Sequence, residues 1–342
     1  MPRISSQAGK SLANIALNRT VADYPFTGQN ISASASRWQL GGGERIAVTS
    51  TWTFTSDTVK FVGTGLPYHS FGNSEQGIQS SGESINAPGN QNFNVSWKYR
   101  GGQRVASPGN KTNDGLIGIW LNGVAMYNPR AQFGVPTGFS ELTGYTYNAS
   151  YEGGQDLGYN FGQDLAGGHT APPNRYHYHD GSFFDAWILG SGWKSGTYGS
   201  TGLAECSLIN YLKGGLTHTD GHSKILGIAA DGYPVYGPYG YNVALNKDSG
   251  VDRMVSGYKL YPISNRIGTL AANLIQYPMG IFIEDYRYSA AGDLDQHNGR
   301  YCVTPEYPNG TYAYFITLNA ELKPTYPYVI GETYYGAPAQ LS

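Results

Sequence analysis

The chain has 342 residues, of which 40% are hydrophobic and 14% aromatic, enough to bury a sizeable core and to exclude disorder over most of its length. Only 13% of the residues are charged and the net charge is -2, so no basic surface for nucleic acid or anionic lipid is expected. No apolar run approaches the roughly 20 residues that span a bilayer. Abundant glycine (48) and tyrosine (29) favour short strands and tight turns.

The segment of residues 1–43 is predicted to be an arm that precedes a β-rich domain at residues 44–342. A short helix is expected at Ser11–Arg19, and the three glycines at 41–43 are a candidate linker. No signal peptide is recognised at the start of the chain. In Ile31–Trp38 apolar residues alternate with serine, so we expect this stretch to add as a strand to a neighbouring subunit. The protein is therefore expected to self-associate into a homo-oligomer or filament.

The remaining sequence predicts a mainly β fold of antiparallel sheets, sandwich-like or irregular, with few short helices and long loops. Alternating polarity or a two-residue turn signal such as Asn122-Gly123 predicts strands and hairpins in four segments: Arg45–Phe54, Thr58–Gly63, Leu116–Asn128 and Ile225–Tyr241. A second short helix is expected at Leu203–Leu212. Cys206 and Cys302 can form at most one disulfide bridge, and the sequence leaves open whether they do.

Two stretches of the chain resemble each other. PNRYHYH at Pro173–His179 aligns with PNGTYAYF at Pro308–Phe315 if the second contains one additional residue. If the chain is duplicated, Tyr176 and Tyr178 correspond to Tyr312 and Tyr314, whereas His177 and His179 correspond to Ala313 and Phe315. The tyrosines would then be structural, and the histidines would serve a more specific purpose.

Histidines are the strongest functional signal, because most of the seven lie close together in the sequence. His177 and His179 would leave one face of a strand side by side, since side chains at i and i+2 share a face. Imidazole nitrogen is a ligand of divalent transition metals, so we expect one such ion, zinc or copper first. His169 could reach back from a Gly-Gly-His turn, and His222 and His69 are the next candidates. The alternative is that these histidines only hydrogen-bond to Asp180 or to backbone carbonyls.

RYHYHD at Arg175–Asp180 resembles the signature that names the YHYH-domain family. Further segments are similar to blocks of that family: GLPYHSFG (Gly65–Gly72), LNGVAMYNP (Leu121–Pro129), HSKILGIAADGYPVYGPYGY (His222–Tyr241), LDQHNGRYCVTPEYPNGTYAYF (Leu294–Phe315) and YPYVIG (Tyr326–Gly331). AGGH at Ala166–His169 departs from the family by lacking a cysteine. The resemblance implies a fold and a histidine-rich site more than an activity. It also implies a setting in bacterial surface or secreted proteins, or in structural proteins of tailed phages, notably those of marine cyanobacteria.

A virion or extracellular structural or adhesion protein is therefore expected, with its metal stabilising a loop-rich domain. One alternative is a metal-dependent enzyme, hydrolase- or oxidase-like, with Asp231 or Glu205 as the base that acts on bound water. Asp231 could equally be a turn residue before Gly232. The other alternative is a module that binds a host-surface glycan through aromatic platforms, for which three residues are candidates: Trp97, Trp187 and Trp193.

Overall fold

The computed structural model describes residues 30–38, 45–66, 88–112, 115–130, 146–150, 168–171, 174–181, 216–266, 274, 277–321 and 323–341. Within these residues the chain is mainly β, as expected, and its helical pieces are two short 3-10 turns, η3 (Ile263–Asn265) and η4 (Ile283–Asp285). The helices expected at Ser11–Arg19 and Leu203–Leu212 lie outside the described residues.

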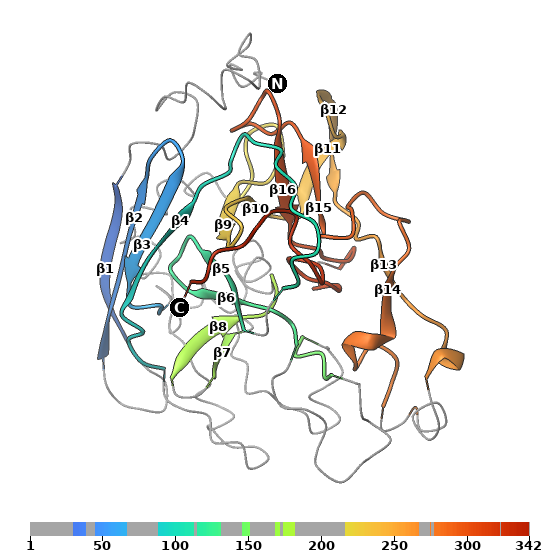
Figure 1. Ribbon diagram of the computed structural model, residues 1–342, viewed down its shortest axis with the longest axis horizontal. Coiled ribbons are helices and arrows are strands. Elements are labelled where there is room, and N and C mark those ends of the chain that lie inside the picture. The colour runs from blue at the N-terminus through green and yellow to red at the C-terminus, as the bar shows by residue number, and fades with distance from the viewer. Residues whose placement is uncertain are drawn as a thin grey trace.

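A four-stranded antiparallel sheet lies at one side of the molecule (Figure 1), in the order β1 (Asn30–Trp38), β2 (Arg45–Phe54), β3 (Thr58–Gly63) and β4 (Phe93–Lys98). β2 and β3 have the predicted bounds. The strand predicted near the N-terminus is present as β1, and it pairs with β2 of its own chain. It therefore extends the sheet of the same chain by one strand.

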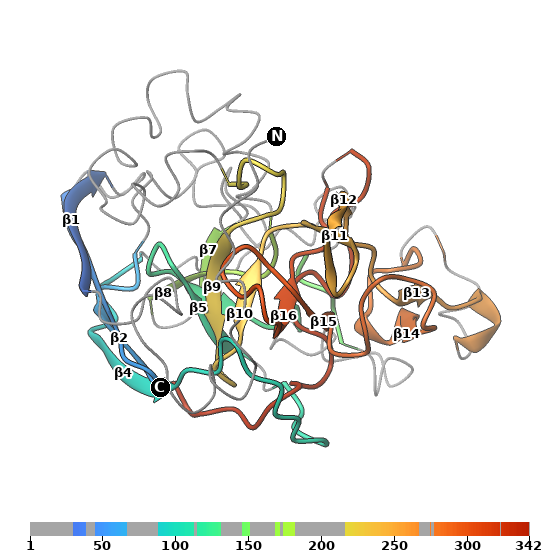
Figure 2. The ribbon, with the colours of Figure 1, turned by 90° about the horizontal axis from the view of Figure 1, so that it is seen from above.

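The second sheet has eight strands and lies at the centre of the molecule (Figures 1 and 2). Its order is β15 (Gly299–Cys302), β16 (Thr311–Phe315), β10 (Pro234–Tyr236), β9 (Ile225–Ala229), β5 (Leu116–Trp120), β6 (Ala125–Tyr127), β8 (Arg175–Tyr178) and β7 (Gly168–Ala171). The predicted Asn122-Gly123 turn connects β5 to β6. Two neighbouring pairs, β6 with β8 and β10 with β16, are parallel, so the sheet is mixed and not purely antiparallel.

The two halves of this sheet repeat one arrangement. In each half a hairpin (β5–β6 or β9–β10) is followed in the sheet by a parallel strand (β8 or β16) and then by an antiparallel edge strand (β7 or β15). The halves meet where β5 pairs with β9. Both hairpin turns contain a glycine at positive φ, Gly123 at 90° and Gly232 at 87°, which a side chain would disfavour. The sheet therefore has a pseudo-twofold relationship about the β5–β9 pair.

The strand registers identify equivalent residues in the two halves. Met126 pairs with Tyr178 and Val235 with Tyr314, so the two tyrosines are equivalent, as the sequence alignment predicts. All four tyrosines of that alignment are buried, with 0 or 1% of their surface exposed: Tyr176, Tyr178, Tyr312 and Tyr314. The same register makes Ala313 the equivalent of His177. The tyrosines are therefore common structural elements, whereas the histidines occur in one half only.

An aromatic core joins the two sheets. The Trp52 ring packs against the rings of Phe61 and Trp97 at 4.7 and 6.1 Å. The Trp97 indole N–H also donates a 3.0 Å hydrogen bond to the carbonyl of Ala229 on β9. Trp97 is only 4% exposed, so it cannot serve as the glycan platform considered from the sequence. Trp187 and Trp193 lie outside the described residues.

Two small ribbons complete the described fold (Figure 1), the pair β11 (Tyr239–Val243) with β12 (Asn246–Arg253) and the pair β13 (Tyr258–Leu260) with β14 (Tyr286–Tyr288). Cys302 on β15 is a free, fully buried thiol, and burial raises its pKa to about 11. It is therefore not half of a disulfide bridge. No helix of the described residues is long and apolar enough to cross a membrane.

Candidate metal centre

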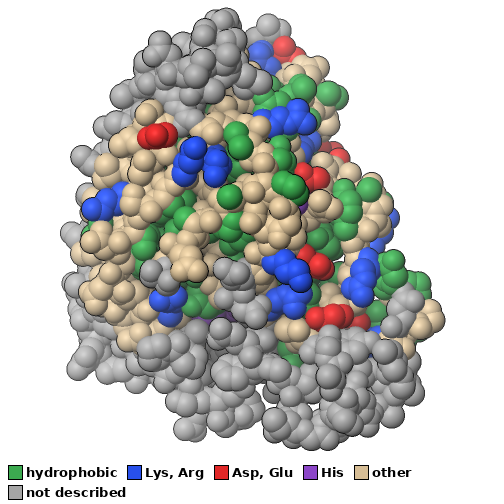
Figure 3. All heavy atoms as spheres, in the orientation of Figure 1, with side chains coloured by type: hydrophobic (Ala, Val, Ile, Leu, Met, Phe, Trp, Pro, Cys, Tyr) green, Lys and Arg blue, Asp and Glu red, His purple; other side chains and the backbone are tan. Residues whose placement is uncertain are grey.

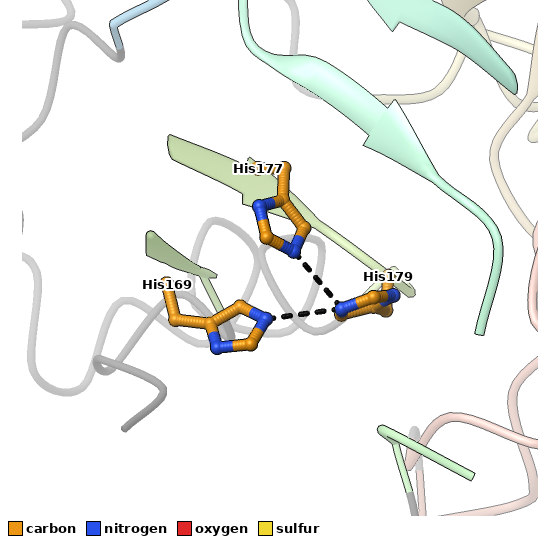
Figure 4. Close-up of side chains that lie close together, drawn as sticks. All are labelled: His169, His177 and His179. Carbon is orange, nitrogen blue, oxygen red and sulfur yellow. Dashed lines mark hydrogen bonds between the residues drawn. The ribbon is translucent and has the colours of Figure 1, made fainter. Parts of the chain in front are cut away.

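The imidazoles of His169, His177 and His179 converge at one edge of the large sheet (Figure 4). His169 lies on the edge strand β7 directly opposite His177 on β8, and His179 follows the end of β8. The Nε2 atom of His179 is 3.0 Å from the Nε2 atoms of both His169 and His177. One ligand atom from each residue lies within 4.8 Å of the other two, so the three side chains could hold a metal ion.

Backbone carbonyls fix which ring nitrogen of two of these histidines carries the proton. His177 Nδ1 is 3.1 Å from the carbonyl oxygen of Arg175, and His179 Nδ1 is 2.6 Å from that of Asn128. A carbonyl oxygen only accepts hydrogen bonds, so both Nδ1 atoms donate and both Nε2 atoms carry a lone pair. Two lone pairs that face each other at 3.0 Å repel unless a cation lies between them.

Protonation is a poor source of that cation. Burial, reinforced by the positive charge that His169 can carry, lowers the pKa of His179 to about 3. Burial also holds the pKa of His177 well below 6.5, with His169 and His179 acting in the same direction. Both imidazoles are therefore neutral near pH 7, which is the protonation state that binds a metal.

The spacing of the nitrogens suits a transition-metal ion. With metal–nitrogen bonds of about 2.1 Å, two nitrogens 3.0 Å apart subtend roughly 90° at the ion. A tetrahedral ion would need a separation of about 3.4 Å, which requires a movement of only a few tenths of an ångström. The donor set of three neutral imidazoles fits zinc, copper, nickel or iron better than calcium or magnesium, which prefer oxygen.

Tyr127 and Arg175 lie beside the histidines. The Tyr127 ring stacks on His177 with centroids 3.9 Å apart and planes 24° apart, and it meets His179 edge-on at 6.1 Å. Arg175 Nη1 donates to the Tyr127 hydroxyl at 3.4 Å, and its Nε donates to Gln91 Oε1 at 3.3 Å. Neither Tyr127 nor the Asn128 carbonyl is among the site residues predicted from the sequence. Both residues lie at the end of the predicted hairpin segment Leu116–Asn128 and within the family-like block Leu121–Pro129.

His222 is not a member of this group. It lies just before β9, in the other half of the sheet, where its ring packs against those of Tyr236, Tyr241 and Phe315 at 5.4, 4.7 and 6.1 Å. Its Nδ1 donates to the carbonyl of Ser223 at 2.7 Å, and its buried Nε2 has no hydrogen-bond partner among the described residues. Burial lowers its pKa to about 4. His69 lies outside the described residues.

Asp231 also lies away from the three histidines. It occupies the β9–β10 turn, where Oδ2 accepts hydrogen bonds from the Tyr314 hydroxyl at 2.7 Å and the Gly336 N–H at 2.9 Å. The equivalent turn residue in the first half is Asn122, which lies 3.5 Å from the Tyr178 hydroxyl. Asp231 is thus a structural turn residue and not a base beside a metal. Glu205 lies outside the described residues.

The fold and this site together define a mainly β protein with a candidate three-histidine metal centre. The family model described as YHYH protein matches residues 101–327, so the chain belongs to the YHYH protein family. The matched region contains all three converging histidines. No curated protein and no solved structure is significantly similar to the chain.

Proposed function

We propose that this protein binds one divalent transition metal ion through His169, His177 and His179. The observation that carries the proposal is the 3.0 Å approach of the unprotonated Nε2 atoms of His177 and His179. A shared ion turns that repulsion into two bonds. Zinc and copper are the first candidates, because both bind imidazole readily.

We further propose that the metal-binding domain belongs to an extracellular or virion structural or adhesion protein that self-associates. The support is compositional, since only 13% of the residues are charged, while the chain contains 48 glycines and 29 tyrosines. On the face shown in Figure 3 the charged side chains lie in small separate groups. The metal would stabilise the edge of the large sheet, because His169 on β7 and His177 on β8 would then be joined through one ion.

A second candidate is a metal centre that binds or transforms an external ligand. Two observations favour it. The triad supplies three protein ligands from the described residues, the number that leaves a coordination position open in catalytic zinc sites. In addition, the second half of the sheet has the same topology with Ala313 where the first has His177. The architecture therefore does not itself require the histidines.

Elemental analysis of the purified full-length protein tests metal binding. We expect one transition-metal ion per chain, and loss of that ion when His177 and His179 are both replaced by glutamine. His297→Gln is a matched control, because this half-buried imidazole bonds to Thr333 and lies outside the triad. A metal content equal in the wild type and the double variant would overturn the proposal.

Light scattering tests self-association separately. A monomer at working concentration would contradict the proposal that the protein self-associates.

A further inference from the structure

We propose that, with the metal ion in place, the histidine triad and Arg175 together bind a small oxyanion, a carboxylate or a phosphate, at the edge of the large sheet. This inference rests on the proposed metal-binding function and adds the chemical class of the ligand. It follows from the charge of the site and from the surroundings of Arg175.

The triad provides no negative charge to balance a divalent ion. Its three ligands are neutral imidazoles, and no aspartate or glutamate of the described residues joins the group. Burial is the main cause of the lowered pKa values of His177 and His179, and the described groups that also act on them are histidines, Arg175 and backbone carbonyls, with no carboxylate among them. His222 differs, because Glu306 and Asp220 both act on it. A buried, uncompensated positive charge is costly, so a bound anion would stabilise the loaded site.

Arg175 adds a second positive charge on the same side. Arg175 and His177 are two residues apart on β8, so their side chains leave the same face of the strand. The Tyr127 side chain connects them, because its ring stacks on His177 and its hydroxyl accepts a hydrogen bond from Arg175. Burial is the main cause of the lowered pKa of His177, and the charge of Arg175 acts in the same direction, which is consistent with this proximity.

The Arg175 guanidinium is held in place without a carboxylate partner. Its Cζ lies 5.5 Å from the centre of the Phe93 ring, and its Nε donates to Gln91 Oε1. Gln91 is itself fixed, because its Nε2 donates to Gly89 and to Asn174 at 2.8 to 3.0 Å. Within the described part of the chain Arg175 forms no ion pair, and its hydrogen bonds use Nε and Nη1. Nη2 is thus left for another acceptor, and a guanidinium binds planar oxyanions well.

The comparison of the two halves of the sheet supports a specific role for this arginine. By the strand registers, Thr311 on β16 is the equivalent of Arg175, as Ala313 is of His177. Thr311 is uncharged and fully buried. The arginine and the histidine pair therefore occur together in one half and are both absent from the equivalent strand of the other. The strand forms in the second half of the sheet without the arginine and without the histidines. Their occurrence together on β8 therefore indicates that they bind the same ligand.

The test uses the full-length protein, with its metal content measured first, and titrates acetate and inorganic phosphate by calorimetry. We expect the metal-loaded wild type to bind at least one of the two probes, and the metal-stripped protein to bind neither. Arg175→Gln should weaken binding about 10-fold or more without changing metal content, and Arg175→Lys should weaken it less because it retains the charge. The comparison of acetate with phosphate distinguishes carboxylate from phosphate ligands.

Arg104→Gln is the matched control, because Arg104 is an exposed arginine that also stacks on an aromatic ring, that of Tyr301 at 4.7 Å. It should leave anion affinity unchanged. The inference is overturned if a correctly folded, metal-loaded Arg175→Gln binds the probes as tightly as the wild type, or if the loaded wild type binds neither. If the wild type takes up no metal, the proposed metal site itself is refuted. Elemental analysis detects that outcome before any anion is added, so the two failures are distinguishable.

Discussion

His177 and His179 direct their Nε2 atoms at each other across 3.0 Å, while each donates its Nδ1 proton to a backbone carbonyl. The carbonyls belong to Arg175 and Asn128, so β8 itself and the segment after β6 together set the orientation of the pair. Such hydrogen bonds to the second ring nitrogen orient the ligand histidines of metal sites and fix their tautomer. The site is thus arranged for a cation before any cation binds.

Replacing the three histidines one at a time should lower metal affinity to different extents. His179→Gln should have the largest effect, because its Nε2 is 3.0 Å from both other Nε2 atoms. Loss of a residue that only supports a ligand costs about 10- to 100-fold in affinity, so loss of His179 should cost more than that. Competition titration with a chromophoric chelator measures each affinity. Equal affinities for wild type and His179→Gln would contradict the assignment.

Metal binding should stabilise the folded chain. At a free metal concentration about 100 times Kd, an ion that binds only the folded state adds about 2.7 kcal/mol. For a chain of 342 residues that raises Tm by about 4 °C, because the entropy of unfolding grows with chain length. Differential scanning calorimetry with added zinc or copper measures the shift, and EDTA should reverse it. A variant with both His177 and His179 replaced should show no shift, and a similar shift in that variant would place the ion elsewhere.

The predicted strands β2 and β3 match the structure because one face of β3, and of residues 49–54 in β2, is buried, so that apolar and polar residues alternate along the sequence. β4 was not predicted, although Phe93, Val95 and Trp97 alternate with polar residues, because glycine- and proline-rich turns on either side favoured a loop. The parallel pairs β6–β8 and β10–β16 were also not foreseen. Long connections separate their partners, and no local pattern specifies such a pairing.

The candidate site was predictable where it depends on strand geometry alone. The i, i+2 rule correctly brought His177 and His179 together. The sequence predicts a turn at His169, but this residue lies on β7 opposite His177, because the Gly-Gly-His segment pairs as an edge strand. The clustering of the histidines in the sequence predicts His222 as a further candidate ligand. In the structure, however, His222 lies just before β9 and packs in the second half of the sheet. Distance along the sequence does not show where one half of the sheet ends and the other begins.

Acid should destabilise the protein through His222, whose pKa falls from 6.5 in the unfolded chain to about 4 in the folded one. The folded state binds fewer protons, so the stability contributed by neutral His222 is complete above pH 6.5 and is lost as pH falls through about 4. Burial is the main cause, opposed by Glu306 and Asp220 and reinforced by His218. The shift corresponds to about 3 kcal/mol.

His222→Phe is the variant that isolates this effect, because a phenyl ring keeps the aromatic packing and does not titrate. Urea unfolding at pH 7, 5 and 4, with metal removed, should show a smaller loss of stability in the variant than in the wild type. Other buried histidines contribute to both proteins equally, so only the difference in slope reports His222. Parallel pH profiles for the two proteins would refute the assignment.

Gly232 should be the more sensitive of two glycines that share one backbone conformation. Gly232 and Gly109 both have φ of +87°, so an alanine at either pays the same cost of about 1–2 kcal/mol for a left-handed conformation. A Cβ at Gly232 would also lie 2.0 Å from the carbonyl oxygen of Lys98, whereas a Cβ at Gly109 meets nothing within 4 Å. Lys98 ends β4, which is fixed by its pairing with β3, so the clash cannot be relieved by a side-chain rotation.

Gly232→Ala is therefore expected to lower the free energy of unfolding by roughly 3 to 5 kcal/mol, and Gly109→Ala only by the conformational cost. Urea unfolding of the two variants measures the difference, and equal losses of stability would mean that the turn between β9 and β10 is not packed against β4.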